Sequence, residues 1–345
     1  MLEALGEEIF LQRDYLAGKP VRSVYLGGGT PSILEPDEIG KLLSAIRGTY
    51  AVEADAEITI EVNPDDVTPA VMAAYREAGI NRISIGVQSF FDEDLDYLNR
   101  IHNGQQSALC IRQVQEAGFT NISADLIFGF PTLTGSRFEE NLRRLVDFNI
   151  PHISAYALTV EPKTALDVLI RKKKLPAPVE EDVVSHFRIL MRVMKENGYE
   201  QYEISNFCKN GLYSFHNSNY WKGEHYLGLG PSAHSFNGIS RQWNIASVIQ
   251  YCEMIRRKER HYETELLAPE QQYNEYVMVS LRTMWGCSLD TIRQEFGEEI
   301  AARTSQIADR FIRSGLLREQ DRIYFLTDEG KIFADRIAME LFADE

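Results

Sequence analysis

The sequence predicts an α/β protein: an incomplete (β/α) barrel followed by a small C-terminal α+β domain that is winged-helix-like. Three observations support this fold class. Short β-branched runs alternate with helical stretches at about 30 residues per unit, only five such runs precede residue 160, and the pattern changes near Tyr262. Strand–helix alternation requires right-handed crossovers, so we expect the strands to form a parallel sheet.

Five strands are predicted, each apolar enough to be buried on both faces, as strands of parallel sheets usually are. They cover residues 21–26, 57–62, 81–87, 121–128 and 152–158. Five strands fit an incomplete barrel better than a closed eight-stranded one. An open Rossmann-type sheet is the alternative topology.

Helices are predicted before, between and after these strands. The first begins at Leu2, shows apolar residues at helical spacing, and can end at Gly18. The others cover residues 37–48, 68–79, 107–118 and 136–148, and a longer one covers 181–197. Three of them stop at a glycine, which is the residue that most often ends a helix.

After the long helix, residues 199–205 predict one more strand, and residues 206–244 form an aromatic, glycine-rich segment with little periodicity. So long an irregular segment in a compact chain is usually functional. We therefore expect a barrel domain at 1–235, a connecting segment at 236–261 and a separate domain at 262–345.

The last segment predicts three helices, a short hairpin and a final helix capped by Thr327. The elements cover residues 270–283, 289–297, 301–315 and 316–327. This order is typical of a winged helix, which often binds DNA. Residues 262–345, however, hold 17 acidic side chains against 9 basic ones, so a docking or structural role is favoured over DNA binding.

Charge and composition exclude several classes of protein. The formal net charge of −15 repels nucleic acid and anionic membranes at long range. The sequence has no apolar run of transmembrane length and no secretory signal, so we expect neither an integral membrane protein nor a secreted one. Its four cysteines, Cys110, Cys208, Cys252 and Cys287, are scattered, which indicates reduced thiols in the cytoplasm.

Polar residues gather where the predicted strands end. The first strand runs into Gly27, Gly28 and Gly29, the second ends at Glu61, and Asp125 interrupts the fourth. Because carboxyl ends of parallel strands meet at one edge, these residues should line a ligand site. Carboxylates suit ribose hydroxyls and an ammonium group, and glycines expose their backbone to a ligand.

Two further residues complete this predicted pocket. Gln88, at the end of the third strand, can both donate and accept hydrogen bonds, and Arg100 can clamp a carboxylate through two parallel bonds. The pocket would therefore suit a nucleoside that carries an amino-acid group.

Several motifs in order resemble one family along essentially the whole chain. YLGGGTPS, EVNPDD, GVQSFFDEDLDYLNRIH, SADLIFGFPTLT and SAYALTVEP are similar to the radical S-adenosylmethionine (SAM) proteins of the coproporphyrinogen dehydrogenase group. The resemblance implies an incomplete (β/α) barrel. It also implies that SAM is contacted by Gly28, Gly29, Thr30, Glu61, Gln88, Arg100, Asp125 and Ala157.

One departure from that family concerns its cluster. The family opens with a strand and a loop carrying CxxxCxxC, whose thiolates hold a [4Fe–4S] cluster. The sequence has no such motif, and its four cysteines do not replace it by any local spacing. Either the sequence is a shortened form of a longer protein that carries the cluster, which we expect, or the protein has lost the cluster. In both cases we expect the chain as it stands to lack cluster and radical chemistry.

A second motif, HNxxYW at residues 216–221, resembles the haem-chaperone branch of the group rather than the decarboxylating dehydrogenase. The imidazole of His216 can ligate haem iron, and Tyr220 and Trp221 offer flat apolar contact to a porphyrin. His216 can equally be a structural histidine, and His234 is a second candidate ligand. The resemblance implies delivery of haem to client proteins such as membrane respiratory enzymes.

Two other functions compete with haem delivery. One is the oxidative decarboxylation of coproporphyrinogen III through a 5′-deoxyadenosyl radical, which would make the chain an enzyme. The other is a DNA-binding regulator built on the C-terminal domain, which the acidic charge disfavours.

Overall fold

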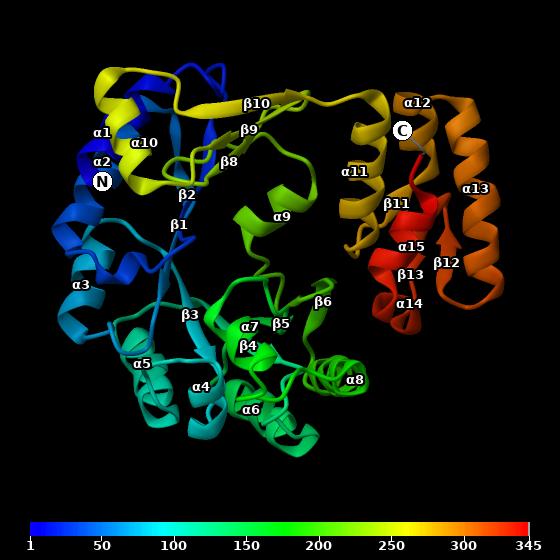
Figure 1. Ribbon diagram of the computed structural model, residues 1–345, viewed down its shortest axis with the longest axis horizontal. Helices are drawn as coiled ribbons and strands as arrows, with labels where there is room; N and C mark the ends of the chain where they lie inside the picture. The colour runs from blue at the N-terminus through cyan, green and yellow to red at the C-terminus, as the bar shows by residue number, and fades with distance from the viewer. Residues whose placement is uncertain (344–345) are drawn as a thin grey trace. The chain divides into compact units, whose positions relative to one another are not determined.

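The computed structural model describes residues 1–343 and confirms a mixed α/β fold (Figure 1). A single sheet of seven strands has the order β1-β2-β3-β4-β5-β7-β6 and curls into a half-barrel. The strands are β1 (Val21–Leu26), β2 (Val52–Val62), β3 (Arg82–Gln88), β4 (Asn121–Phe128), β5 (His152–Ala157), β6 (Glu200–Glu203) and β7 (Asn206–Cys208).

The pairing confirms the predicted parallel core. Strands β2, β3, β4 and β5 pair in parallel, and β5, β7 and β6 then pair antiparallel. The second strand begins at Val52, five positions before the predicted start, because Val52–Ala56 continues the extended backbone although Glu53 and Asp55 interrupt the apolar pattern.

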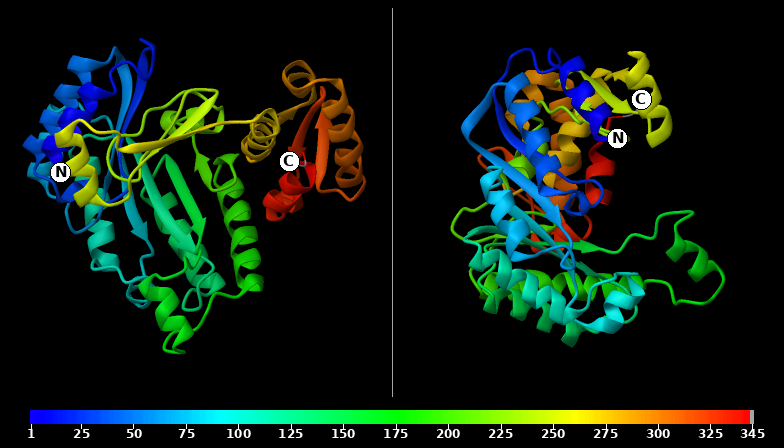
Figure 2. Two further views of the ribbon diagram at one scale, coloured as in Figure 1. Left: turned by 45° about the horizontal axis from the view of Figure 1, so that its top comes forward. Right: turned by 90° about the vertical axis from the view of Figure 1, so that its left-hand side faces the viewer.

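Helices connect the strands, and those predicted at 37–48, 68–79, 107–118, 136–148 and 181–197 are confirmed to within three residues at each end. The first helix ends at Leu11 and not at Gly18, since residues 12–18 form turns, and the short helices at 92–97 and 165–171 were not predicted. The helices are α1 (Leu2–Leu11), α2 (Pro36–Thr49), α3 (Pro69–Glu77), α4 (Asp92–Tyr97), α5 (Gly104–Glu116), α6 (Gly135–Asp147), α7 (Ala165–Arg171) and α8 (Glu180–Glu196). Asn103 starts α5 with a capping box. Its side chain accepts a hydrogen bond from the backbone amide of Gln106, and the Gln106 side chain accepts one from the backbone amide of Asn103. Helix α5 packs on β3 and α8 on β4, so both cover the sheet (Figure 2).

The segment predicted to be irregular contains short regular elements. They are β7, helix α9 (Phe215–Trp221), strand β8 (His234–Phe236) and strand β9 (Ser240–Asn244). The prediction missed them because each is too short to show a period. Strands β8 and β9 form a second sheet with β10 (Tyr262–Leu266), and α10 (Val248–Arg257) links β9 to β10.

The smaller C-terminal domain has the order helix, strand, two helices, hairpin and two helices (Figure 1). Its elements are α11 (Pro269–Leu281), β11 (Cys287–Ser288), α12 (Leu289–Phe296), α13 (Glu298–Arg313), β12 (Leu317–Gln320), β13 (Ile323–Leu326), α14 (Asp328–Ile332) and α15 (Ala334–Leu341). The three strands form an antiparallel sheet in the order β11-β13-β12.

Two compact units make up the chain, and they do not follow its linear order. One unit comprises Met1–Val24, Asp37–Ala56 and Phe215–Glu345, and the other comprises Tyr25–Pro36 and Glu57–Ser214. Within residues 1–343, every helix is too short or too polar to cross a lipid bilayer.

Glu8 is the buried centre of the first unit. Its carboxylate accepts hydrogen bonds from Tyr251 Oη (2.5 Å), Asn244 Nδ2 (2.6 Å) and the Gly230 amide (2.7 Å), and His261 Nε2 lies 2.9 Å away. Four partners around one buried carboxylate compensate its loss of hydration. Glu8 therefore ties α1 to α10, to β9 and to the turn before β8.

Glu8→Ala should lower the thermal unfolding midpoint by several degrees. Removing the carboxylate leaves buried donors unpaired, which costs about 3 kcal/mol. Circular dichroism melting would measure the change. Glu7→Ala is the matched control, since Glu7 is exposed on the same helix, and an equal loss in both variants would contradict this role of Glu8.

Candidate functional site

One face of strands β3, β4 and β5 is polar, although we expected these strands to be apolar on both faces. Because side chains alternate along a strand, every second residue shares a face. The residues of this face are Arg82, Ser84, Gln88, Ser123, Asp125, His152 and Ser154. The expectation was wrong because helices cover only the other face, where Ile83, Ile85 and Val87 are buried.

The amino-terminal half of this polar face is filled by its own hydrogen bonds. Arg82 donates to Asn121 Oδ1 (2.5 Å) and to Ser123 Oγ (3.3 Å). The ring of His152 bonds Ser123 Oγ at 2.5 Å and Tyr202 Oη at 2.8 Å. Burial, and then the charge of Arg82, hold the pKa of His152 well below its usual range, so the ring is neutral.

The carboxyl-terminal half of the face holds two carboxylates. Tyr25 Oη donates to Glu61 Oε1 at 2.7 Å, and Ser84 Oγ donates to Asp125 Oδ2 at 3.2 Å. Burial, assisted by the charge of Glu61 and opposed by hydrogen bonds from Ser154 and Ser84, raises the pKa of Asp125 to about 6. Asp125 can therefore bind a cationic or hydroxyl group and can change protonation near neutral pH.

The glycine turn after β1 is shaped by these carboxylates. A Cβ on Gly27 would lie 2.7 Å from Glu61 Oε1, so no larger residue fits there without displacing Glu61. Gly28 has a φ of 79°, which favours glycine. A Cβ on Gly28 or Gly29 would meet nothing within 4 Å, so the turn borders open space in which a ligand can reach its backbone.

An unusual local backbone positions Gln88, and burial near two carboxylates characterises Arg100. Gln88 has a φ of 62° and follows an irregular register between β3 and β4. A Cβ on Gly86 would lie 3.0 Å from Gln88 Nε2, so this glycine leaves room for the amide. Burial lowers the pKa of Arg100, and the charges of Asp125 and Asp65 oppose that shift.

The structure thus groups Gly28, Gly29, Glu61 and Asp125 in one unit, with Arg100 close enough to Asp125 to feel its charge. Thr30 follows the glycine turn and begins a short 3₁₀ turn. Ala157 ends β5 and pairs with Phe128. All eight predicted SAM residues belong to this second compact unit.

Three residues of this site were missed from the sequence: Tyr25, Ser84 and Ser154. Tyr25 is two positions before Gly27, which places both on one face of β1, and that spacing could have revealed it. Ser84 and Ser154 donate to Asp125. Small hydroxyls give no sequence signal of their own, and only the register between β3, β4 and β5 shows their role.

The predicted haem residues lie on helix α9, in the first unit. His216 Nδ1 is 3.1 Å from Ser23 Oγ, and the ring is partly buried. Tyr220 is exposed and meets Trp221 edge to face, with centroids 5.6 Å apart. Since a helix turns about 100° per residue, Tyr220 lies about 40° from His216 around α9 and Trp221 about 140° away.

Two donors on or near α9 are buried without a hydrogen-bond partner in the described structure: Ser218 Oγ and Trp221 Nε1. Unpaired buried donors are unusual in folded proteins and suggest a bound acceptor. His234, the second candidate ligand, begins β8 with an exposed side chain, and its ring centroid is 6.4 Å from that of Trp243.

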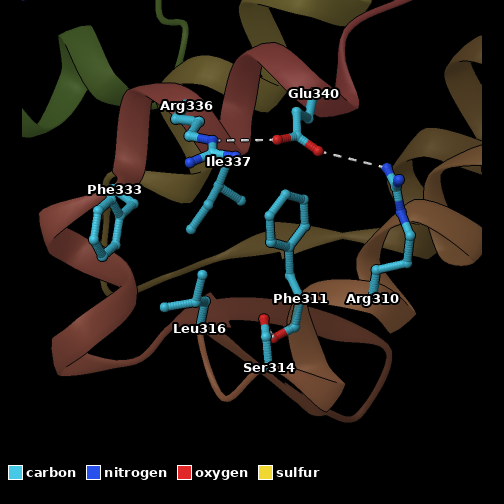
Figure 3. A pocket seen from close by; sticks show the side chains of 8 residues that line it. All are labelled: Arg310, Phe311, Ser314, Leu316, Phe333, Arg336, Ile337 and Glu340. Carbon is cyan, nitrogen blue, oxygen red and sulfur yellow. Dashed lines mark hydrogen bonds and ion pairs between the residues drawn. The ribbon is translucent and has the colours of Figure 1, made fainter.

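A pocket of about 300 Å³ lies in the C-terminal domain. Figure 3 shows Glu340 between Arg310 and Arg336 at its rim, with Phe311 and Ile337 below. Its lining comprises Arg310, Phe311, Ser314, Leu316, Phe333, Arg336, Ile337 and Glu340. None of these eight residues is among those predicted to contact SAM or haem.

The four cysteines do not form a cluster site. All are free thiols, and three of them are buried. Among residues 1–343, no group of three or more His, Cys, Asp or Glu side chains is arranged to hold a metal ion. Residues 1–343 therefore do not fit a [4Fe–4S] cluster.

Comparison with known proteins identifies the family. Residues 6–145 match the Radical SAM superfamily, and residues 267–333 match the HemN C-terminal domain. The heme chaperone HemW of Bacillus subtilis is 33% identical over 339 residues, covering 97% of this chain and 89% of that protein.

The chain belongs to the HemW family. The HemW protein of Mycobacterium tuberculosis is 32% identical over 99% of the chain and 85% of its own length. Among solved structures, coproporphyrinogen III oxidase (HemN) of Escherichia coli has a TM-score of 0.85 at 24% identity, covering 99% of this chain and 82% of that one. The HemW family thus shares its fold with HemN.

Gly27→Ala should destabilise the chain by about 1–3 kcal/mol, since the added methyl group must displace Glu61 or Tyr25. Gly29→Ala is the matched control, because its methyl group meets open space, and it should change stability by less than about 0.5 kcal/mol. Chemical denaturation of the three proteins would measure this. Equal stability of both variants would contradict the packing of Glu61 against Gly27.

Asp125→Asn should stabilise the protein at pH 7.5 but not near pH 4. The carboxyl ionises near 3.8 when unfolded and near 6 when folded, so its contribution to stability is lost as the pH rises from about 4 to about 6. The side-chain amide introduced by Asp125→Asn cannot ionise, so the variant does not lose this stability as the pH rises. Thermal unfolding midpoints at both pH values test the prediction, which a difference independent of pH would contradict.

Proposed function

We propose that this chain binds haem at helix α9 and transfers it to haem-requiring client proteins. Membership of a family whose relatives are named heme chaperone HemW supports this proposal. The observation that carries it is the arrangement of the HNxxYW motif: His216 at the start of α9, oriented by Ser23, with the exposed ring of Tyr220 one turn later.

The chemistry of these residues fits haem. A hydrogen bond to one imidazole nitrogen fixes the ring orientation of a metal-binding histidine, and Ser23 Oγ supplies such a bond at Nδ1. Tyr220 offers an aromatic face, and Ser218 and Trp221 supply buried donors that have no partner in the described structure. Haem carries two carboxylates, which are acceptors for such donors.

We further propose that SAM binds the second unit at the glycine turn. Its amino-acid and ribose groups would contact Glu61, Gln88, Arg100 and Asp125, and the open backbone of Gly28 and Gly29 would face it. Bound SAM would supply a positively charged sulfonium group beside these carboxylates. The residues of this chain bind and orient it, and the partly raised pKa of Asp125 lets that carboxyl accept or release a proton near pH 6.

The partners and location follow from the same proposal. Clients would be haem-requiring proteins, with membrane respiratory enzymes as one class, and nucleic acid would not be a partner because the chain is strongly acidic. The four free thiols fit the reducing cytoplasm.

Haem titration followed by Soret absorbance tests the haem site. Wild type should bind saturably, His216→Ala should weaken binding about tenfold or more through loss of an iron ligand, and His234→Ala should behave as wild type. Transfer of bound haem to apomyoglobin would then measure delivery. Absence of saturable binding by wild type would refute the proposal, and a loss confined to His234→Ala would move the iron site to β8.

Turnover of coproporphyrinogen III by a longer form of the protein, reconstituted with a [4Fe–4S] cluster, would favour the dehydrogenase alternative instead. The fold shared with HemN is compatible with both functions.

A further inference from the structure

The last residue of α9 and the residue that follows it contact the C-terminal domain through two reciprocal cation–π pairs. Arg282 Cζ lies 5.2 Å from the centroid of the Trp221 ring, and Lys222 Nζ lies 4.3 Å from that of Trp285. Each partner thus contributes one cation and one indole. Both distances are within the range in which a cation is attracted to an aromatic face.

A second set of contacts connects α11 to Tyr220. Glu275 on α11 forms an ion pair with Arg241 on β9. Tyr226 lies within electrostatic reach of both and shares a side-chain hydrogen bond with Tyr220, whose ring centroid is 5.2 Å away. Both aromatic residues of the HNxxYW motif are therefore linked to the same helix of the C-terminal domain.

Helix α9 depends on such contacts. It has seven residues, and a helix of two turns is marginal in water unless tertiary packing holds it. Ser23 contacts its first turn through His216, and Arg282 contacts its last residue. The orientation of α9, and with it the position of His216 and Tyr220, is set from both ends.

We propose that the C-terminal domain positions the haem helix, with Arg282, Glu275 and Lys222 as positioning residues. The inference rests on the proposed function. Arg282 covers a face of the Trp221 ring, so this face anchors α9, while Trp221 Nε1 at the ring edge, His216 and Tyr220 are left to haem. Haem affinity then depends on residues more than fifty positions beyond the motif.

Arg282→Ala is the direct test, with two readouts. Haem affinity should fall about three- to tenfold, as expected for the loss of a partly buried cation–π contact, and the Soret maximum should shift because His216 is no longer held. In the haem-free protein, hydrogen–deuterium exchange of residues 216–222 should become faster. Arg282→Lys, which keeps the cation, should restore most of the haem affinity and most of the protection of residues 216–222 from exchange.

Two controls separate positioning from general stability. Arg282 also pairs with Asp335 at 3.1 Å, and Asp335→Asn removes that ion pair while leaving the cation over Trp221. Arg293→Ala removes exposed ion pairs to Asp290 and Glu298 in the same domain. Both controls should match wild type in haem affinity and in exchange of α9.

Lys222→Ala keeps the inference testable if Arg282→Ala fails to fold, because Lys222 is exposed. It should also speed exchange of residues 216–222. If hydrogen–deuterium exchange of residues 216–222 is unchanged in Arg282→Ala and in Lys222→Ala, and both variants are folded, the inference is overturned whether or not haem binds. If exchange rises in the variants but wild type does not bind haem, the proposed function fails while the contact stands.

Discussion

The carboxylates of Glu61 and Asp125 are the constraint on which the second unit depends. Two acids on one buried face of a sheet are unfavourable unless neighbours bond them. Tyr25 donates to one, Ser84 to the other, and Arg100 lies near enough to be affected by Asp125. The same requirement extends to the backbone, since Glu61 occupies the space that a side chain at residue 27 would need.

Much of this arrangement could be predicted from the sequence. The β-branched runs placed the parallel strands, and Glu61 and Asp125 were recognisable because a carboxylate inside an apolar strand needs a partner. The amino-terminal half of the polar face was not recognised from the sequence. Arg82 and His152 lie within the predicted strands, but their bonding partners come from other strands, and only the sheet register brings them together across Ser123.

The haem region was harder to predict. The HNxxYW motif identified His216, Tyr220 and Trp221, but no period revealed α9 or the strands that follow it. The prediction treated the two aromatics as one porphyrin surface. The structure shows Tyr220 exposed and Trp221 facing Arg282, a contact between residues 61 positions apart that no local pattern encodes. That both aromatics contact haem stays a prediction. The predicted domain limits at 235 and 262 stay a prediction.

The hydrogen bonds among Arg82, Ser123, His152 and Tyr202 make these four side chains depend on one another. Each of them is buried and bonded to another member of the set. A substitution at one of these four positions would leave a buried donor or acceptor without its partner, which costs more than the hydrogen bond itself contributes. Such a set should therefore change as a whole in evolution and not one residue at a time.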